Sequence, residues 1–399
     1  PAPIAHERVL LWMCVLVSVN QLGFGSIIPV VPLYAQSFGV SQFAIGMTVA
    51  VYGLARFAVA IPTGQIADHL GRRSTLAIGG LVSTAGNLWC AVATSYEELV
   101  AARFIAGVGG GLVLTGGVIV LADITTPERR GRTMAIYQGT FLFAVGIGPL
   151  PGGWLAERFG LAAPFLAYAL AAVVVGLIAW FAVKETRGLG KSTDTRQPEL
   201  PPLHEQLKLL MQLVGFRLVS IISFAHAITR TGALFSIVPV FVSVRLGLTP
   251  SQIGFGFALG SVLGLIATYP GGMLTDRFGR KSVIVPAGLA TGVSMALFSI
   301  AGSYTWFLLA VVVWGVASAM GASAPAAYAA DCAPPRMNAT AMSSYRMLAD
   351  LGYVIGPLAL GALADYQGAT TALWFAAAMM VAVTLGFGRW APETYRADR

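Results

Sequence analysis

Long apolar stretches separated by short polar breaks recur along the whole chain, and they restrict its fold more than any other feature. A helix needs about 20 mainly apolar residues to cross a bilayer, and twelve stretches approach or exceed that length. Their residues are apolar in unbroken runs rather than in alternation, which argues against a β-barrel. Only 11% of the residues are charged, whereas soluble domains carry about a quarter. We therefore expect an all-α integral membrane protein. The expected spans are approximately residues 9–36, 43–67, 75–95, 99–122, 133–154, 161–183, 218–244, 252–275, 282–302, 306–330, 341–364 and 370–388.

The positive charges are distributed unevenly between the two sides that these spans define. Most of the 25 Lys and Arg residues fall in the even-numbered loops and at the termini, while Arg158 and Arg245 fall in the opposite loops. Positive charge is enriched on the cytoplasmic side of membrane proteins. We therefore expect a multi-pass protein of the cell membrane with both termini in the cytoplasm. The formal net charge of +8 then reflects topology and gives no reason to expect a nucleic-acid partner.

The two halves of the chain are related by one offset of 208 residues. The matches are residues 64–73 with 272–281, Asp123 with Asp331, and Gly148-Pro149 with Gly356-Pro357. A polar segment with three prolines separates six spans from the other six, as expected of a linker. We therefore expect two pseudo-symmetric six-helix bundles, residues 1–183 and 217–399, joined by a cytoplasmic linker at residues 184–216. Parallel repeats of this kind place a substrate site at their interface near the bilayer midplane.

A charged loop motif, Gly-x-x-x-Asp-x-x-Gly-Arg-Arg/Lys, occurs once in each half, between the second and third spans. One copy could be an ordinary positively charged loop, but two copies at equivalent places favour a conformational gate. The candidate gate residues are Gly64, Asp68, Gly71, Arg72, Asp123, Gly272, Asp276, Gly279 and Arg280. The motif resembles the signature loop of the major facilitator superfamily. This resemblance implies the major facilitator fold, and it implies that Arg72 pairs with Asp123 at the end of the fourth helix. It also implies that Asp68 docks on the opposite half as a latch that favours the outward-open state.

A second run of small residues and prolines lies in the fifth span. Proline bends a membrane helix and glycine lets a neighbouring helix approach closely. The helix-packing candidates are Gly148, Pro149, Gly152, Gly153, Gly356 and Pro357. The run resembles the antiporter motif of proton-coupled exporters in the same superfamily, although Pro151 departs from its usual spelling. Residues 103–107 resemble a further family motif, in which the arginine, here Arg103, helps to move protons. These resemblances imply the twelve-helix drug:proton antiporter branch.

Several ionisable residues fall inside the expected spans, where a charge costs roughly 3 kcal/mol on insertion scales and is a functional hypothesis by default. Asp350 is the one carboxylate that we place well inside a span, and His226 and Arg230 share a helix face. In a purely structural interpretation, these charges pair with one another or with backbone carbonyls. In a second interpretation, Asp350, His226 and Arg103 couple transport to protons. In a third, Arg56 and Arg230 from opposite halves attract an anionic or zwitterionic substrate, because the first span has amides rather than an acid at mid-depth. The candidate substrate-binding residues are Asn20, Gln21, Phe24, Tyr52, Arg56, His226, Arg230 and Trp314.

Taken together, these features favour a secondary active transporter that moves a small organic molecule by alternating access. Proton-coupled, multidrug-type efflux is the first hypothesis, and transport or exchange of organic anions or zwitterions is the alternative. A transporter-like receptor without flux is a third possibility. The expected partners are the substrate, protons and membrane lipid, and the protein is expected to be a monomer. The three cysteines have no metal-ligand spacing. We expect no metal, no cofactor and no enzymatic activity.

Overall fold

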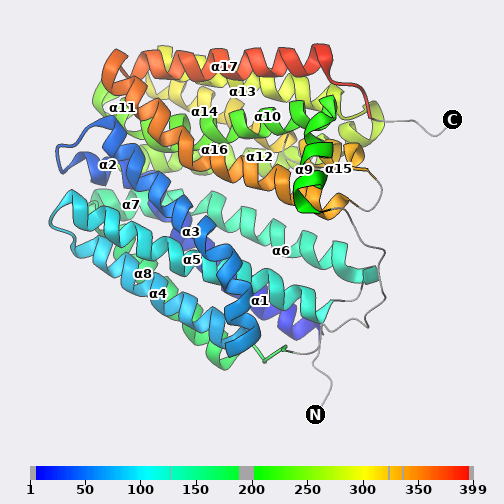
Figure 1. Cartoon of the computed structure of the whole chain (residues 1–399). Helices are drawn as coiled ribbons and strands as arrows, with labels where there is room; N and C mark the ends of the chain where they lie inside the picture. Colours follow the sequence, from blue (N-terminus) through cyan, green and yellow to red (C-terminus); the bar gives the residue numbers. More distant parts are fainter. Residues whose placement is uncertain (1–5, 126, 188–201, 322–323, 335–336, 395–399) are drawn as a thin grey trace. The chain divides into compact units, whose positions relative to one another are not determined.

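The chain is organised as membrane-spanning helices, as the hydropathy pattern predicts (Figure 1). The computed structural model describes residues 6–125, 127–187, 202–321, 324–334 and 337–394. Within these residues, 12 helical segments are long and apolar enough to cross a membrane, which confirms the predicted fold class.

The first half of the chain begins with a helix that ends before two prolines. It comprises α1 (His6–Ile27), α2 (Val31–Gln36), α3 (Gln42–Leu70), α4 (Arg72–Val92), α5 (Tyr96–Ile124), α6 (Pro127–Ile147), α7 (Pro149–Phe159) and α8 (Ala163–Phe181). The single stretch predicted at residues 9–36 is therefore two helices with a turn between them. Proline lacks a backbone N–H and cannot continue the hydrogen-bond ladder of a helix.

The second half contains the corresponding spans and a segment of π-helix. It comprises α9 (Leu203–Gln212), α10 (Val214–Ile228), η1 (Thr229–Ile237), α11 (Val238–Leu246), α12 (Pro250–Phe278), α13 (Lys281–Ile300), α14 (Tyr304–Met320), α15 (Ala324–Cys332), α16 (Asn338–Gln367) and α17 (Ala369–Trp390). The seventh span, predicted as one continuous helix, thus contains nine residues of π-helix. Such segments are rare and occur frequently at functional sites.

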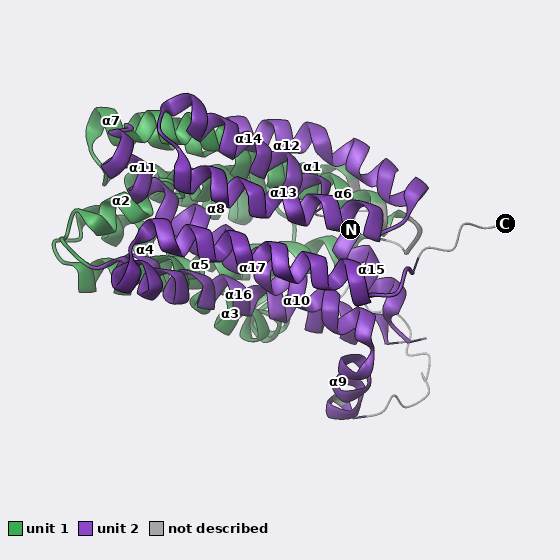
Figure 2. Cartoon of the chain, turned by 90° about the horizontal axis from the view of Figure 1, so that it is seen from above, with its two compact units in different colours: residues 1–40, 47–195, 249–258 green, residues 41–46, 196–248, 259–399 purple. Residues whose placement is uncertain are grey.

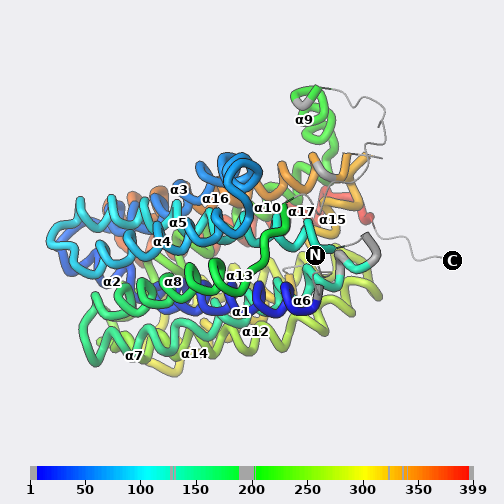
Figure 3. Tube along the Cα trace, turned by 90° about the horizontal axis from the view of Figure 1, so that it is seen from below, coloured from blue at the N-terminus to red at the C-terminus, as the bar shows by residue number. Residues whose placement is uncertain are grey.

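The contacts divide the chain into two units, which Figure 2 shows in different colours. Unit 1 consists of Pro1–Val40, Met47–Thr195 and Thr249–Ala258, and unit 2 of Ser41–Gly46, Arg196–Leu248 and Leu259–Arg399. The beginnings of α3 and α12 therefore belong to the unit that does not contain the rest of the helix. Residues 188–201 of the predicted linker lie outside the described residues. The amphipathic helix α9 occupies another part of it and projects beyond the end of α10 (Figures 2 and 3).

Small residues bring the helices of each unit close together. In unit 1, α4 packs against α5 and α8, and α1 packs against α6 and α8. A Cβ added to Gly109 of α5 would lie 2.2 Å from the backbone nitrogen of Ser83 of α4, so only glycine fits there. In unit 2, α13 packs against α14 and α17, and α10 packs against α16. This use of glycine is typical of helix packing in lipid, where close backbone contact replaces the hydrophobic driving force.

The prolines of the two repeats bend their helices differently. At Pro149 the helix is interrupted, so that α6 ends at Ile147 and α7 begins at Pro149. At Pro357 helix α16 continues, although proline cannot donate to the carbonyl four residues earlier. That carbonyl belongs to Tyr353, and it lies 3.2 Å from the Thr231 hydroxyl of η1, which also contacts the Ala227 carbonyl of its own span at 2.8 Å. The π-helix therefore places a shared hydroxyl donor beside the backbone acceptor that has no helical N–H donor at Pro357.

Two carboxylates cap helix beginnings at equivalent positions of the repeat. In unit 2, the Asp365 carboxylate accepts hydrogen bonds from the backbone nitrogens of Gln42, at 2.7 Å, and Phe43, at 2.8 Å, where α3 begins. In unit 1, the Glu157 carboxylate accepts one from the backbone nitrogen of Ser251, at 3.2 Å, where α12 begins. Helix N-termini favour negative charge. Glu157 and Asp365 are 208 residues apart, so the capping follows the repeat.

Candidate functional site

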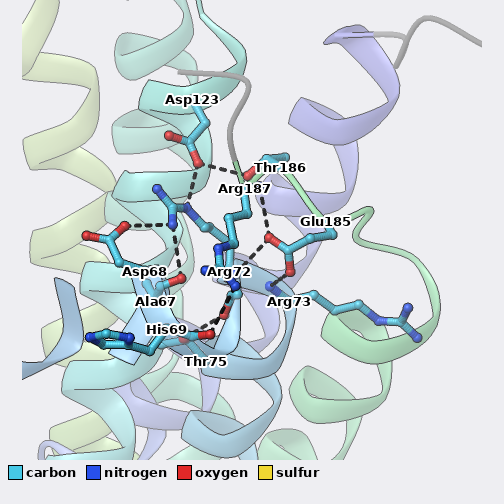
Figure 4. A network of polar contacts seen from close by, with 11 residues as sticks. Ala67, Asp68, His69, Arg72, Arg73, Thr75, Asp123, Glu185, Thr186 and Arg187 are labelled. Carbon is cyan, nitrogen blue, oxygen red and sulfur yellow. Dashed lines mark hydrogen bonds and ion pairs between the residues drawn. The ribbon is translucent and has the colours of Figure 1, made fainter. Parts of the chain in front are cut away.

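The signature loop of unit 1 joins α3 to α4 and is centred on Arg72 (Figure 4). Gly71 has a φ of +94°, a conformation that suits glycine, and this turn directs Arg72 toward two carboxylates. The Arg72 Nε donates to the Asp123 carboxylate at 2.8 Å, and its Nη1 donates to the Asp68 carboxylate at 2.7 Å. The side chains of Arg72 and Asp123 are each 11% exposed, whereas that of Asp68 is 71% exposed. Arg72 and Asp123 therefore form the inner pair, and Asp68 lies at the surface of the unit.

A third carboxylate, Glu185, caps the start of α4 beside this pair. Its oxygens accept hydrogen bonds from the backbone nitrogens of Arg72, at 2.9 Å, and Arg73, at 3.2 Å. The adjacent Thr186 hydroxyl donates to Asp123 at 3.0 Å. Burial acts to raise the pKa of Glu185, but the hydrogen bonds from backbone N–H groups outweigh it and hold the pKa below its ordinary value of 4.5. The segment after α8 is thus fixed to the loop by charge-assisted hydrogen bonds.

The second copy of the loop, in unit 2, has the same arrangement with longer contacts. Arg280 Nε donates to Asp331 at 3.1 Å and its Nη1 donates to Asp276 at 3.3 Å. Gly279 has the same φ of +94° as its counterpart. The Thr394 hydroxyl donates to Asp331 at 3.2 Å, as Thr186 does to Asp123 in unit 1. The Asp331 side chain is 34% exposed, so the pair in unit 2 is more open to solvent than the pair in unit 1.

The glycines predicted to support these loops differ in their surroundings. Gly64 and Gly272 have no atom within 4 Å of an added Cβ, so their lack of a side chain is not explained by packing within either unit. The glycines of the proline-containing helices are tightly packed. An added Cβ on Gly152 would meet the Ser26 carbonyl oxygen, one on Gly148 would lie 2.7 Å from the Gly25 Cα, and one on Gly356 would lie 2.7 Å from the Ile228 Cα. For Gly153, a Cβ would meet the carbonyl of Pro250 within unit 1.

The polar residues predicted in the first span lie in the interior of unit 1. Asn20 and Gln21 are 1% and 2% exposed, and the Asn20 amide donates to the Gln21 side chain at 2.9 Å. The Tyr168 hydroxyl of α8 donates to the Asn20 carbonyl oxygen at 3.5 Å. Phe24 is also buried, and its ring stacks on Tyr52 with a centroid separation of 5.2 Å. The structure thus brings four of the predicted substrate-binding residues together, with Asn20 bonded to Gln21 and Phe24 stacked on Tyr52.

Arg103 of α5 lies against the same group and is only 2% exposed. Its guanidinium is 4.4 Å from the centroid of the Tyr52 ring, and its Nε donates to the Thr48 carbonyl at 3.2 Å. Within the described part of the chain, Arg103 makes no ion pair, and its Nη1 has no hydrogen-bond partner. A buried charge without a counter-ion is energetically costly. Cation–π attraction to Tyr52 offsets part of this cost.

A second group of predicted residues lies in unit 2, on α10, η1 and α14. His226 Nε2 and Ser318 Oγ are 3.3 Å apart and link α10 to α14. Trp314 is one helical turn from Ser318 and so on the same face of α14; its indole N–H is buried and has no partner among the described residues. Arg230 lies in η1, is exposed, and its guanidinium is 5.3 Å from the centroid of the Phe235 ring. This group offers several hydrogen-bond donors within one unit.

The remaining predicted residues, Arg56 and Asp350, are half-buried and belong to different units. Arg56 lies on α3 in unit 1, and Asp350 lies on α16 in unit 2. Helix α16 packs along α10 and η1, which carry His226 and Arg230. Among the described residues, no cluster of three or more His, Cys, Asp or Glu side chains could hold a metal ion.

The structure also reveals functional candidates that our sequence reasoning missed. Glu185 and Thr186, which contact the loop of unit 1, are matched at the offset of 208 by Glu393 and Thr394. Glu157 and Asp365 are matched in the same way. Extending the repeat comparison beyond the loop motifs would have found all three pairs, since their residue types are the same or similar in the two halves. The π-helix has no comparable signal in the sequence.

Spanning helices arranged in two repeated groups, with an arginine–carboxylate loop in each, define a class of protein: a polytopic membrane transporter. Comparison with known proteins gives the family. The profile of the Major Facilitator Superfamily matches residues 13–223 and again residues 219–399. The chain therefore belongs to the Major Facilitator Superfamily. It is a transporter of the secondary active type and a multi-pass membrane protein.

Individual relatives agree with this assignment. The chain is 26% identical to multidrug resistance protein 1 of Bacillus subtilis over 361 residues, which cover 86% of each protein. It is 24% identical to the quinolone resistance protein NorA of Staphylococcus aureus over 347 residues, covering 86% of this chain and 87% of NorA. Its fold is similar to that of a bacterial homologue of the human lysosomal transporter Spinster, with a TM-score of 0.76, 17% identity, and coverage of 96% and 95% of the two chains.

Proposed function

We propose that this transporter exports a small organic molecule in exchange for protons, and that Asp350 carries the coupling proton. One observation carries the proposal: Asp350 is the single carboxylate well inside a membrane span in the described part of the chain. Intramembrane carboxylates that face a bundle interior mark proton relays in transporters. Helix α16 packs on the elements that carry His226 and Arg230, so Asp350 belongs to the same unit as these two residues.

The relatives support the direction and the class of substrate. Two of them are named for resistance to multiple drugs or to quinolones, and export of a drug from the cell produces resistance to it. At 24–26% identity, this supports efflux as a proposal without fixing the substrate. The basic loops at the ends of α3 and α12 support a cytoplasmic location for both signature loops and for the termini.

The signature loops fit a gate in this proposal. Arg72 is held by the inner pair with Asp123, while the Asp68 carboxylate remains mostly exposed. An exposed, oriented carboxylate is available to a helix N-terminus or a donor elsewhere in the transporter. We propose that Asp68 acts as the latch of the cytoplasmic gate during alternating access.

Efflux from cells tests the coupling role of Asp350. Cells that produce the wild-type protein should accumulate less ethidium than cells without it, and Asp350→Asn should abolish this difference at equal protein level. Glu97→Gln is a matched control, because Glu97 is an exposed carboxylate at the end of a span. If Asp350→Asn exports ethidium as well as the Glu97→Gln control, Asp350 is not the coupling residue.

A second candidate function is transport of organic anions or zwitterions. It is favoured because the polar group of unit 1 around Asn20 is uncharged at mid-depth of α1 and the polar group of unit 2 contains a positive charge. Mid-depth in α1 the chain has the neutral Asn20–Gln21 pair, and η1 presents the exposed Arg230. Arginine binds carboxylates in a bidentate manner. In this case a carboxylate-bearing dye such as fluorescein should raise the melting temperature of the purified protein, and Arg56→Gln or Arg230→Gln should remove the shift. Ethidium should give no shift.

A receptor without flux is the remaining possibility, and a counterflow assay separates it from both transport proposals. Liposomes that contain the protein and are preloaded with unlabelled compound should take up labelled compound. Ligand binding without such exchange would identify a receptor.

A further inference from the structure

We propose that unit 2 binds a phospholipid with a negatively charged headgroup in a groove formed by α12, α13 and α14. The groove has a volume of about 710 Å³, within the range of sites that hold small molecules. Its lining is almost entirely apolar and includes Leu274, Phe278, Pro286, Ala290, Val312 and Val316. This site is separate from the transport function proposed above.

The groove lies on the opposite side of α14 from the polar group of unit 2. Val312 and Val316 line the groove, and each is two residues from Trp314, hence roughly 200° away around the helix axis. Ser318, which contacts His226, is on the Trp314 side. Phe278 and Pro286 are exposed at the groove. The groove therefore opens on the apolar surface of three spanning helices, where the hydrocarbon chains of lipids can occupy it.

Positive charge lies at one end of the groove. Helix α12 ends at Phe278, and the exposed guanidinium of Arg277 is 5.3 Å from the centroid of the Phe278 ring. The loop that follows also carries positive charge. Arg280 pairs with Asp276 and Asp331. The Lys281 ammonium donates to the Ala391 carbonyl at 2.7 Å, and this neutral partner does not neutralise its charge.

An apolar groove that ends at a cationic helix terminus matches the two parts of an anionic phospholipid. The acyl chain would lie between α12 and α13 against α14, and the phosphate would lie at Arg277. Basic residues at the membrane surface attract anionic lipids.

Three positions of the groove lining carry larger residues in the first half of the chain. At the offset of 208 residues, Ala290 corresponds to Val82, Val312 to Phe104 and Pro286 to Ile78. At the positions of Phe278, Ala287 and Ala317 the first half instead has the smaller residue, so the two halves differ in both directions. Because the larger residues of the first half occur in the same helical context in the same chain, they are conservative choices for filling the groove.

Native mass spectrometry of the full-length protein in detergent tests the proposal, with dioleoyl phosphatidylglycerol and dioleoyl phosphatidylcholine as probes. The wild-type protein should retain phosphatidylglycerol in preference to phosphatidylcholine. The double variant Ala290→Val/Val312→Phe should retain about tenfold less of either lipid, because the acyl chain loses its groove. Arg277→Gln should lower the preference for phosphatidylglycerol about fivefold and leave phosphatidylcholine unchanged.

Matched controls separate these effects from general changes at the surface. Val293→Phe adds the same side chain at an exposed position of α13 outside the groove, and Arg389→Gln removes an exposed charge at the end of α17. Both should behave like the wild type. Wild-type retention by the double variant, or an unchanged lipid preference in Arg277→Gln, would overturn the proposal. If the double variant does not fold, Ala290→Val alone and Arg277→Gln decide the outcome by the same criteria.

Discussion

Among single residues, Arg103 is unusual because its charged side chain is buried and its Nη1 has no hydrogen-bond partner within the described part of the chain. It is 2% exposed, stacks on Tyr52 and makes one backbone hydrogen bond. Replacing a buried charge by an apolar side chain of similar size is often neutral or stabilising. Membrane proteins typically retain a costly buried charge because the charged residue has a function.

The first prediction follows from this cost. Arg103→Met should leave the melting temperature of the purified protein unchanged or raise it, while gradient-driven transport is lost. The exposed Arg346 provides the control, and Arg346→Met should keep the melting temperature unchanged. A clear fall in the melting temperature of Arg103→Met would instead identify Arg103 as a structural anchor of α5.

Glu185 gives a second prediction at this scale, because its pKa is lowered in the folded protein by hydrogen bonds from backbone N–H groups. A carboxylate with a lowered folded pKa stabilises the protein above its unfolded pKa, and this stability is lost as the pH falls through the folded pKa. The contribution of Glu185 should therefore be full above about pH 4.5, its ordinary pKa, and disappear below it.

Thermal melts across this pH range measure the contribution of Glu185. Glu185→Gln should lower stability by roughly 1 kcal/mol at neutral pH, and the difference from the wild type should shrink as the pH falls below 4.5. A difference between the two proteins that stays constant with pH would show that the charge of Glu185 does not stabilise the start of α4.

At the scale of elements, the two signature loops have the same sequence pattern but different geometry. The Arg72–Asp68 contact is 2.7 Å and the Arg280–Asp276 contact is 3.3 Å. Ion pairs with an exposed partner contribute little to stability, about 0–1 kcal/mol. If replacing either aspartate strongly reduces transport, the loss would therefore reflect a role in the transport cycle rather than lower stability.

We expect Asp68→Asn to stop transport while expression and melting temperature stay close to wild type. Asp276→Asn is the matched control in the second loop, and it should reduce transport less, because its contact with Arg280 is longer and its side chain more exposed. Near-normal efflux by Asp68→Asn would contradict the role of Asp68 as a latch.

The Thr231 hydroxyl of the π-helix lies between two backbone acceptors. It is 2.8 Å from the Ala227 carbonyl of its own span and 3.2 Å from the Tyr353 carbonyl of α16, which Pro357 leaves without a helical N–H donor. Thr231→Val should lower the free energy of unfolding by about 1 kcal/mol, the range of interhelical hydrogen bonds in membranes. Thr229→Val is the control, since Thr229 bonds only within its own helix turn, to Ala225. Equal effects of the two substitutions would argue against the interhelical bond.

Different elements were predictable from the sequence to different degrees. The spans followed from hydropathy, because a bilayer demands long apolar runs. The loop residues Asp68, Arg72 and Asp123 stood out because the motif occurs twice, and the structure brings them into contact. The π-helix at Thr229–Ile237 has no distinctive sequence pattern. The burial of Asn20 and Gln21 inside unit 1 depends on how α1 is rotated against α6 and α8, which hydropathy does not determine.

In the whole molecule, the internal repeat accounts for most of the architecture and includes the candidate gate residues, whereas several candidate coupling and binding residues inside the spans depart from it. Arg103 corresponds to Val311, Arg56 to Gly264 and Asp350 to Leu142. The lipid groove is a departure of the same kind, since Ala290 replaces a larger residue.

The proposed coupling of proton movement to export through Asp350 can be tested with the purified protein in liposomes under an imposed pH gradient. Wild-type protein should drive ethidium against its concentration gradient into an acidic lumen and stop when a protonophore collapses the pH difference. Asp350→Asn should still exchange ethidium but should not respond to the gradient. Accumulation that ignores the gradient in the wild type, or that persists unchanged in Asp350→Asn, would contradict the account.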